Sequence, residues 1–177
     1  NWLRANPVDV LCLQELKMET EKFPHEMFAS LGYRAEAFGQ KTYNGVAIIV
    51  KNELPTLRDV QRGIPGFDDE QSRAIAVTIG DVRVIDLYVV NGQAVDSDKF
   101  QYKLRWLEAA SAWIESERAA HKKLVVVGDF NIAPTDADVH DPKAWDGQVL
   151  CTPQERAYFQ RWLDAGLPPQ RITVSSD

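Results

Sequence analysis

The stretch best suited to chemistry is VVVGDFNIAP at residues 125–134, in which a run of valines ends in GDFN. Gly, Asp and Asn frequently form the turn after a strand, so a structural role competes with a chemical one. If the chain stays extended, Asp129 and Asn131 are two residues apart and point to the same side. That spacing would hold a carboxylate and a carboxamide together over a reacting group.

Polar side chains also follow two other apolar segments. Glu15 comes shortly after the apolar run 8–13, and Tyr88 and Asn91 end a later one. Ligands of open α/β sheets collect at the carboxyl ends of the strands. We therefore expect these groups to share one rim of a sheet with Asp129.

Carboxylates at one rim suit a hard divalent cation. Mg²⁺, with Mn²⁺ as the alternative ion, binds through one or two carboxylates, waters and substrate phosphate. Such an ion polarises a phosphorus centre, while tyrosine and asparagine side chains donate to the charge that develops on the phosphate. Each strand end alone is more often a turn, a helix cap or a core tyrosine. The three together favour metal-assisted phosphoryl chemistry.

Other catalytic classes lack their signatures in the sequence. It contains no GxxxxGK[ST] phosphate loop, no GxGxxG and no GxSxG serine elbow. His25, His121 and His140 stand far apart and form no zinc-type cluster with the two cysteines. We interpret all three histidines as surface or capping residues.

The composition is that of one soluble globular domain, with 177 residues, 45% apolar and 26% charged. A net charge of −6 disfavours non-specific coating of nucleic acid but allows a local basic groove. No apolar run approaches the roughly 20 residues of a membrane-spanning helix. Without a leader and with two cysteines outside any regular framework, a cytoplasmic location with no membrane partner is expected. The oligomeric state stays open.

Strands alternate with helices along the chain, which predicts a mixed α/β layered domain. The apolar runs 8–13, 46–50 and 124–127 predict buried strands, the first covered on both faces, and 73–79 with 82–90 predict a hairpin around Gly80-Asp81. The predicted helices are a short one near Pro24 with Met27, Phe28 and Leu31 on one side, a long one from Ser97 or Asp98 to about Ala120, and one after the capping box Thr152-Pro153-Gln154-Glu155.

Six segments, in order, give the chain a specific resemblance. From Trp2 to Leu167 it resembles the exonuclease III branch of the endonuclease/exonuclease/phosphatase family, although the family usually has Pro where this chain has Val90. The matching segments are DVLCLQELK (9–17), YNGVAIIV (43–50), LYVVNGQ (87–93), KFQYKLRWL (99–107), GDFNIAP (128–134) and TPQERAYF (152–159).

The resemblance implies an incomplete layered α/β sandwich of mixed β-sheets flanked by helices, with a partial domain at 1–167. It implies that Glu15 binds Mg²⁺ and that Asp129 orients and deprotonates the attacking water or assists the leaving group. Asn131 would hold that water or a phosphate oxygen, and Tyr88 would stabilise the pentacovalent phosphorane.

The substrate implied is duplex DNA with an abasic site or a 3′ end, cut as by an exodeoxyribonuclease III or abasic-site endonuclease of base excision repair. DNA phosphates need a basic rim. Its candidates are Arg73, Lys17, Lys41, Lys99 and Lys103.

Both ends of the chain depart from the family pattern. The family's first strand would precede Asn1, and its later strands, with an Asp and a catalytic His, would follow Leu167. Segment 168–177 is expected to be a divergent, poorly ordered tail, the sheets to have exposed edges, and the chain alone to be inactive or severely impaired. The alternatives are another phosphoesterase of the same fold, a non-catalytic DNA-binding remnant, or a partly folded fragment.

Overall fold

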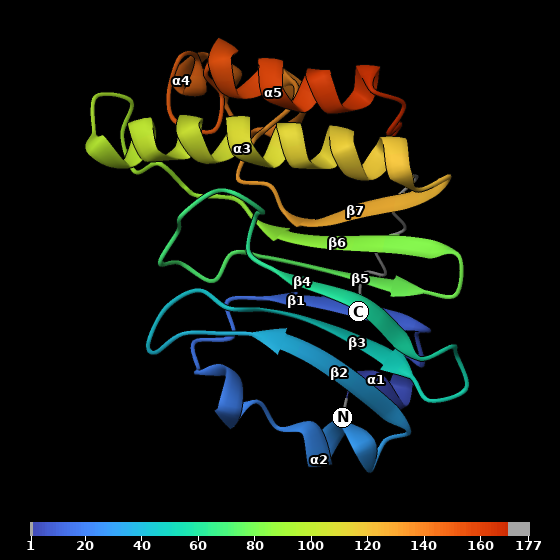
Figure 1. The fold of residues 1–177 in the computed structure, drawn as a ribbon. Helices are drawn as coiled ribbons and strands as arrows, with labels where there is room; N and C mark the ends of the chain where they lie inside the picture. The colour runs from blue at the N-terminus through green and yellow to red at the C-terminus, as the bar shows by residue number, and fades with distance from the viewer. Residues whose placement is uncertain (1, 170–177) are drawn as a thin grey trace.

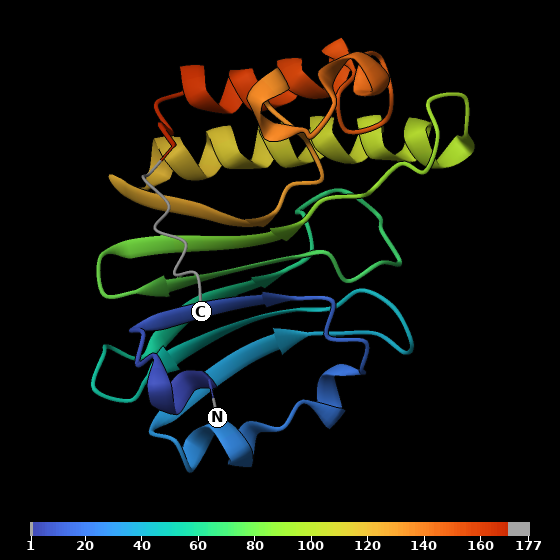
Figure 2. The same ribbon diagram turned by 180° about the vertical axis from the view of Figure 1, so that it is seen from behind.

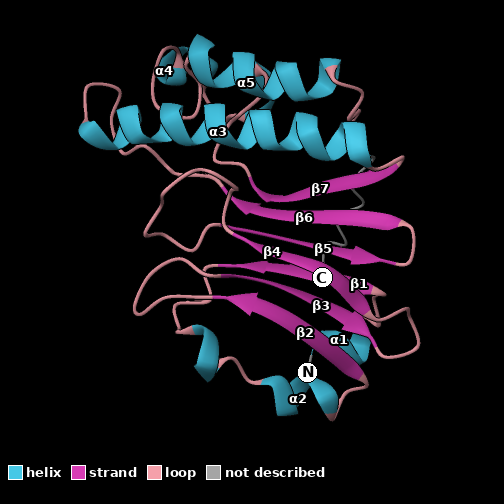
Figure 3. Ribbon diagram, in the orientation of Figure 1, coloured by secondary structure: helices cyan, strands magenta, loops and turns pink. Residues whose placement is uncertain are grey.

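The protein is built from two β-sheets packed face to face, with helices on both outer faces (Figure 1). The computed structural model describes residues 2–169. The helices of the two outer layers lie on opposite sides of the paired sheets (Figure 3). This agrees with the predicted layered α/β sandwich.

The first sheet has three antiparallel strands in the order β1-β3-β2. They are β1 (Val10–Gln14), β2 (Tyr33–Phe38) and β3 (Val46–Lys51). The short helices α1 (Trp2–Ala5) and α2 (His25–Ala29) cover its outer face (Figure 1), and a 3₁₀ turn, η1 (Thr20–Lys22), leads into α2.

The second sheet has four strands in the order β4-β5-β6-β7, antiparallel except for the parallel pair β6–β7. They are β4 (Leu57–Arg62), β5 (Ala74–Ile79), β6 (Val82–Tyr88) and β7 (Lys123–Asp129). The hairpin predicted at Gly80-Asp81 is confirmed, and it joins β5 to β6. The apolar pattern does not predict strand β4, because its sequence, LRDVQR, is mostly polar.

The parallel β6–β7 pair requires a long crossover, and helix α3 (Asp98–Ala120) supplies it. Its predicted cap is confirmed, since the Ser97 side chain accepts a hydrogen bond of 3.1 Å from the Phe100 amide. After β7 come η2 (Asp136–Asp138), α4 (Pro142–Trp145) and α5 (Pro153–Asp164). The predicted capping box of Thr152 and Glu155 starts α5, which lies beside α3 when seen from either side (Figure 2).

Alternating side chains divide the core into three parts because successive residues of a strand face opposite sides. Ile75 and Val77 of β5 pack between the sheets, whereas Ala74 and Ala76 face the α3 layer. Ala47 and Ile49 of β3 face the layer of α1 and α2.

Three burial predictions are wrong. Val125 of β7 is 43% exposed because β7 is an end strand of its sheet. Residues 10–14 of β1, another end strand, are only half-buried rather than covered on both faces. Met27 is 52% exposed, while Phe28 turns into the core.

The tail expected at 168–177 falls mainly outside the described residues. Within the described part of the chain, no helix is long and apolar enough to cross a membrane.

Candidate active site

Pairing of β6 with β7 brings the predicted catalytic residues together. Tyr88 and Asp129, the last residues of these strands, are partners in the parallel register. The Tyr88 hydroxyl donates a hydrogen bond of 3.0 Å to Oε1 of Glu15, just beyond the end of β1. Glu15, Tyr88 and Asp129 therefore meet at one rim, although they come from both sheets.

Glu15 is held by a strained backbone. Its φ of 54° lies in the left-handed region, which is costly for a residue other than glycine and occurs often at functional sites. The Lys17 amide fixes this turn by donating to the Asn44 carbonyl at 2.9 Å. The Lys17 ammonium lies 3.0 Å from Glu15 Oε2. The hydrogen bonds from Lys17 and Tyr88 lower the pKa of Glu15, so the exposed carboxylate is ionised.

Tyr88 is kept protonated and oriented. Burial, followed by its hydrogen bond to Glu15, raises the pKa of the Tyr88 phenol. The Arg73 guanidinium lies 4.8 Å from the centre of the Tyr88 ring and donates to the Tyr88 carbonyl at 3.2 Å. Gln71 accepts from Arg73 Nε at 2.7 Å. Arg73 therefore supports Tyr88, a contact that the sequence did not predict.

Strand β7 continues through Asp129, and the chain then turns as the composition of GDFN allowed, because Asp129 accepts a hydrogen bond from the amide two residues further on, as in an Asx turn. The chain is therefore not extended from Asp129 to Asn131. Gly128 permits this path: a Cβ atom there would lie 1.9 Å from the Leu87 carbonyl oxygen. Beyond the strand, Asn131 adopts a φ of 46°, and its amide donates to Asp129 Oδ1 at 3.1 Å. The Asp129 side chain is exposed at the rim.

The Asn131 carboxamide is fixed on both sides. Its Nδ2 donates to the Val89 carbonyl at 2.9 Å, and its Oδ1 accepts from Asn91 Nδ2 at 3.2 Å. The sequence placed Asn91 near the rim without giving it a role. The structure makes it the partner of Asn131.

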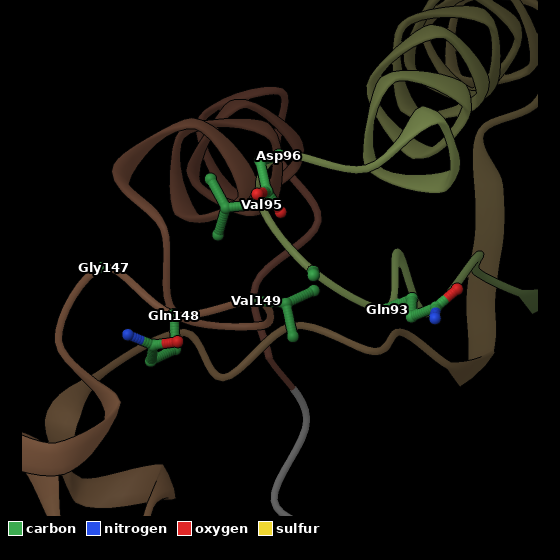
Figure 4. Close-up of a pocket in the computed structure, with 7 residues that line it drawn as sticks. Gln93, Val95, Asp96, Gly147, Gln148 and Val149 are labelled. Atoms are coloured by element: carbon green, nitrogen blue, oxygen red, sulfur yellow. The ribbon is translucent and has the colours of Figure 1, made fainter.

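One hollow opens at this rim, and another lies along the loop after β6, which also carries Asn91. A cavity of about 560 Å³ begins at Asp129 and Asn131 and continues along apolar side chains that include Trp145. A cleft of about 360 Å³ lies between the loop after β6 and the loop before α5 (Figure 4). Gln93 and Gln148 come from its two opposite loops, and their amides can both donate and accept hydrogen bonds.

The predicted basic residues lie in different environments. Lys17 pairs with Glu15, and Lys41 and Lys99 are exposed. Lys103 was predicted to lie on a basic rim, and this is wrong: its side chain is 0% exposed and forms an ion pair with Glu155. The position of Lys103 on α3 suggested an exposed side chain, because the sequence gives no sign that a buried carboxylate of α5 would pair with it.

Two further residues were not singled out from the sequence. Tyr43 is 69% exposed in the loop next to Lys41, and its neighbour Asn44 accepts from the Lys17 amide. Asp86 is 0% exposed between the sheets, where Gln14 donates to it at 2.6 Å. An acid within the apolar run VIDLY was the available signal for Asp86.

The residues at the rim can bind a hard cation that needs only one or two protein carboxylates. Among residues 2–169, no three His, Cys, Asp or Glu side chains form a cluster that could hold a metal ion. Mg²⁺ needs only one or two carboxylates when water and substrate phosphate complete its shell. Glu15 is ionised, exposed and already paired with the Lys17 ammonium, so its carboxylate suits a cation.

Comparison with known proteins defines the class. The Endonuclease/Exonuclease/phosphatase family matches residues 1–173. The chain is 34% identical to exodeoxyribonuclease III of Haemophilus influenzae, covering 94% of this chain and 70% of that protein. The chain therefore belongs to this family and is homologous to exodeoxyribonuclease III-like nucleases.

Two solved structures share the fold. A 3′ phosphatase from Neisseria, bound to a product DNA hairpin, superposes with a TM-score of 0.89 at 46% identity over 93% of this chain. An AP endonuclease from Archaeoglobus fulgidus gives a TM-score of 0.83 at 34% identity over 92% of it. The chain spans 63% and 62% of these two proteins, respectively.

Proposed function

We propose that this protein hydrolyses phosphodiester and phosphomonoester bonds at 3′ ends and abasic sites of duplex DNA. The observation that carries the proposal is the meeting of Glu15, Tyr88, Asp129 and Asn131 at one rim. The hollow that begins at Asp129 and Asn131 leaves the rim open to a polymer. The comparisons support this by homology to nucleases of DNA repair.

Asp129 serves as the general base. It lies exposed, and its Oδ1 accepts only from the Asn131 amide among the described hydrogen bonds. A water placed against the remaining carboxylate oxygen would lose its proton to Asp129 as it attacks phosphorus. Asn131, held by Asn91 and the Val89 carbonyl, keeps one Nδ2 hydrogen for the water or a phosphate oxygen.

Tyr88 stabilises the charge that builds up on the phosphate. Its raised pKa keeps the hydroxyl protonated at neutral pH, which is the form that donates. A donor that is already positioned loses little energy to reorganisation when the charge develops. In the structure described here, that donor is directed at Glu15, so substrate would compete with Glu15 for it.

We propose Mg²⁺, or Mn²⁺ in its place, as the cofactor, with Glu15 as its protein ligand. When bound, the ion would neutralise charge on the substrate phosphate and on the leaving oxygen. The ion pair of Lys17 with Glu15 would then open, since both cations compete for one carboxylate. This frees Lys17 for a DNA phosphate.

The proposed DNA surface combines exposed lysines with one exposed aromatic ring. Lys17, Lys41 and Lys99 supply the positive charge, and Tyr43 beside Lys41 offers a ring that can stack on a nucleotide. Arg73 acts mainly through Tyr88, over whose ring it lies.

Processing of 3′ ends is the first substrate choice and abasic-site cleavage the second. The 3′ phosphatase from Neisseria is 46% identical to this chain, against 34% for the AP endonuclease from Archaeoglobus. Single-turnover rates test this order of preference when they are measured on one duplex with a 3′ phosphate and on one with an abasic site. A faster rate on the abasic duplex would reverse it.

Two alternative functions can be distinguished from the proposed one by the same assay. A DNA-binding remnant without catalysis would bind both duplexes and cut neither, whether or not Mg²⁺ is added. A phosphoesterase of the same fold with another substrate would hydrolyse a small phosphodiester and ignore DNA. The same assay with a chromogenic phosphodiester separates all three.

A further inference from the structure

A fully buried ion pair is hydrogen-bonded to the backbone of the candidate site. Lys103 of α3 is 0% exposed, and so is its ion-pair partner Glu155. Its ammonium donates to the Asn91 carbonyl at 3.1 Å and to the Asn131 carbonyl at 2.5 Å. A lysine ammonium has three donors, so these two carbonyls and Glu155 use all of them.

The two carbonyls belong to the asparagines whose side chains meet above. Asn91 lies on the loop after β6 and Asn131 on the loop after β7, and their carboxamides are joined by the 3.2 Å hydrogen bond. One ammonium therefore ties together the backbones of the two loops that present these groups. Asp129 is tied to the same unit through the Asn131 amide.

Glu155 connects this unit to α5. Its Oε1 accepts from the Leu150 amide at 3.0 Å, and its Oε2 accepts from the Thr152 amide and hydroxyl at 3.1 and 2.7 Å. The carboxylate thus caps α5 and pairs with Lys103 at once. The start of α5, the loop before it and both site loops share one buried polar network.

Gly92 shows that the loop after β6 is fitted to the lysine stem. It has a φ of 96°, and a Cβ atom there would lie 3.1 Å from Lys103 Cδ and 3.1 Å from Val149. A side chain on the loop would therefore crowd the stem, and both neighbours would have to shift by a few tenths of an ångström. The positive φ of Gly92 also favours glycine at this position.

We propose that Lys103, charged against Glu155, is a positioning residue that fixes the Asn91 and Asn131 backbones so that their carboxamides and Asp129 stay aligned. This inference deepens the proposed function and rests on it. Net stability does not explain the pair, because well-packed apolar residues often replace buried ion pairs without loss. Alignment of two loops does explain it, since a misplacement of about 1 Å can reduce a catalytic rate by about 10²-fold.

Hydrogen exchange tests the positioning role without any need for activity. The double variant Lys103→Met with Glu155→Gln removes both charges and avoids leaving either one buried alone. Segments 89–93 and 129–133 contain bonded amides, including Val89 to the Asp129 carbonyl and Ala133 to the Leu150 carbonyl. Their exchange should rise at least about tenfold, while that of β5 changes by less than about twofold.

Lys122→Met changes an exposed lysine away from the site and should leave the hydrogen exchange of all segments unchanged. Uniform change across the fold, or no change in the two segments, would overturn the inference. Where the unmodified protein cleaves DNA, kcat of the double variant should fall about 10²-fold with KM within about threefold. Loosened loops with an unchanged kcat would also overturn it. If the unmodified protein does not cleave DNA, only the proposed function is contradicted. The hydrogen-exchange result would still decide whether Lys103 positions the two loops.

Discussion

Tyr88 and Glu15, 73 residues apart in the chain, are joined by a hydrogen bond of 3.0 Å between the phenol and the carboxylate. The bond links the end of β6 in one sheet to the end of β1 in the other. Packing of the two sheets therefore assembles the site, and neither sheet contains it alone. The left-handed φ of Glu15 and the contact of Arg73 with the Tyr88 ring hold the two ends of this bond.

Replacing Tyr88 with Phe should slow the chemical step and leave folding intact. The ring and its contact with Arg73 remain, while the donor to the developing charge is removed. We expect kcat on a 3′-phosphorylated duplex to fall by about 10²- to 10³-fold, with KM within a few-fold. Tyr102→Phe removes a hydroxyl that donates to Asp69, and serves as the matched control. A kcat reduced less than tenfold in Tyr88→Phe would remove Tyr88 from the mechanism.

Gly128→Ala should destabilise the protein by at least about 3 kcal/mol. The new Cβ would collide with the Leu87 carbonyl oxygen at 1.9 Å, so β7 must separate from β6. Gly147→Ala is the control: its φ is also positive, at 67°, but nothing lies within 4 Å of the added Cβ. It should cost about 1 kcal/mol. Urea unfolding of both variants measures the difference, and equal costs would contradict the close packing described.

Stability should fall between about pH 5 and 8 because of Asp86. Burial raises the pKa of this carboxyl from 3.8 to about 8, so in this range the folded protein holds a proton that the unfolded chain has released. The free energy of unfolding then decreases as pH rises, with a slope approaching about 1.4 kcal/mol per pH unit for one proton.

Asp86→Asn should flatten this slope, because the amide does not titrate. Asp81→Asn should leave it unchanged, since pairing with Lys123 lowers the pKa of Asp81 and places its titration below this range. Urea unfolding at several pH values measures both. A slope that survives Asp86→Asn would assign the pH dependence to another group.

Salt dependence of DNA binding tests the proposed basic surface. The slope of log K against log salt falls by about 0.9 for each DNA phosphate that the protein no longer neutralises. Lys41→Met and Lys99→Met should each reduce the slope by up to that amount, and Lys122→Met should not. Titrations of a labelled duplex with the Asp129→Asn protein avoid cleavage during the measurement. Unchanged slopes in both variants would mean that DNA binds to a different surface of the protein.

The fold and the main site residues could be predicted because their signals are local. The Ser97 cap, the Gly80-Asp81 hairpin and the Thr152–Glu155 capping box each lie within a few residues and were confirmed. The juxtaposition of Glu15 with Tyr88 depended on the packing of two sheets, which no local pattern specifies. The rule on strand ends placed Glu15, Tyr88 and Asp129 at the rim of one sheet, whereas the structure brings them together from two sheets.

Lys103 and Val125 show where sequence patterns fail. A lysine on an amphipathic helix is almost always exposed, and only Glu155, 52 positions further on, makes its burial possible. A valine-rich strand is usually buried on both faces, but β7 lies at the end of its sheet. Both errors arise from neighbours that are distant in sequence.

The most direct test of the proposed function is a single-turnover assay with protein in excess over a duplex that carries a 3′ phosphate or one abasic site. We predict Mg²⁺-dependent hydrolysis, abolished by a chelator and reduced about 10²- to 10⁴-fold in Asp129→Asn. The exposed Asp164→Asn should match the unmodified protein. Of the two expectations stated for this chain, inactivity and severe impairment, the proposed function requires the second, which is a measurable rate below that of the Haemophilus relative. Absence of hydrolysis by folded protein, or hydrolysis that persists in Asp129→Asn, would contradict the proposed function.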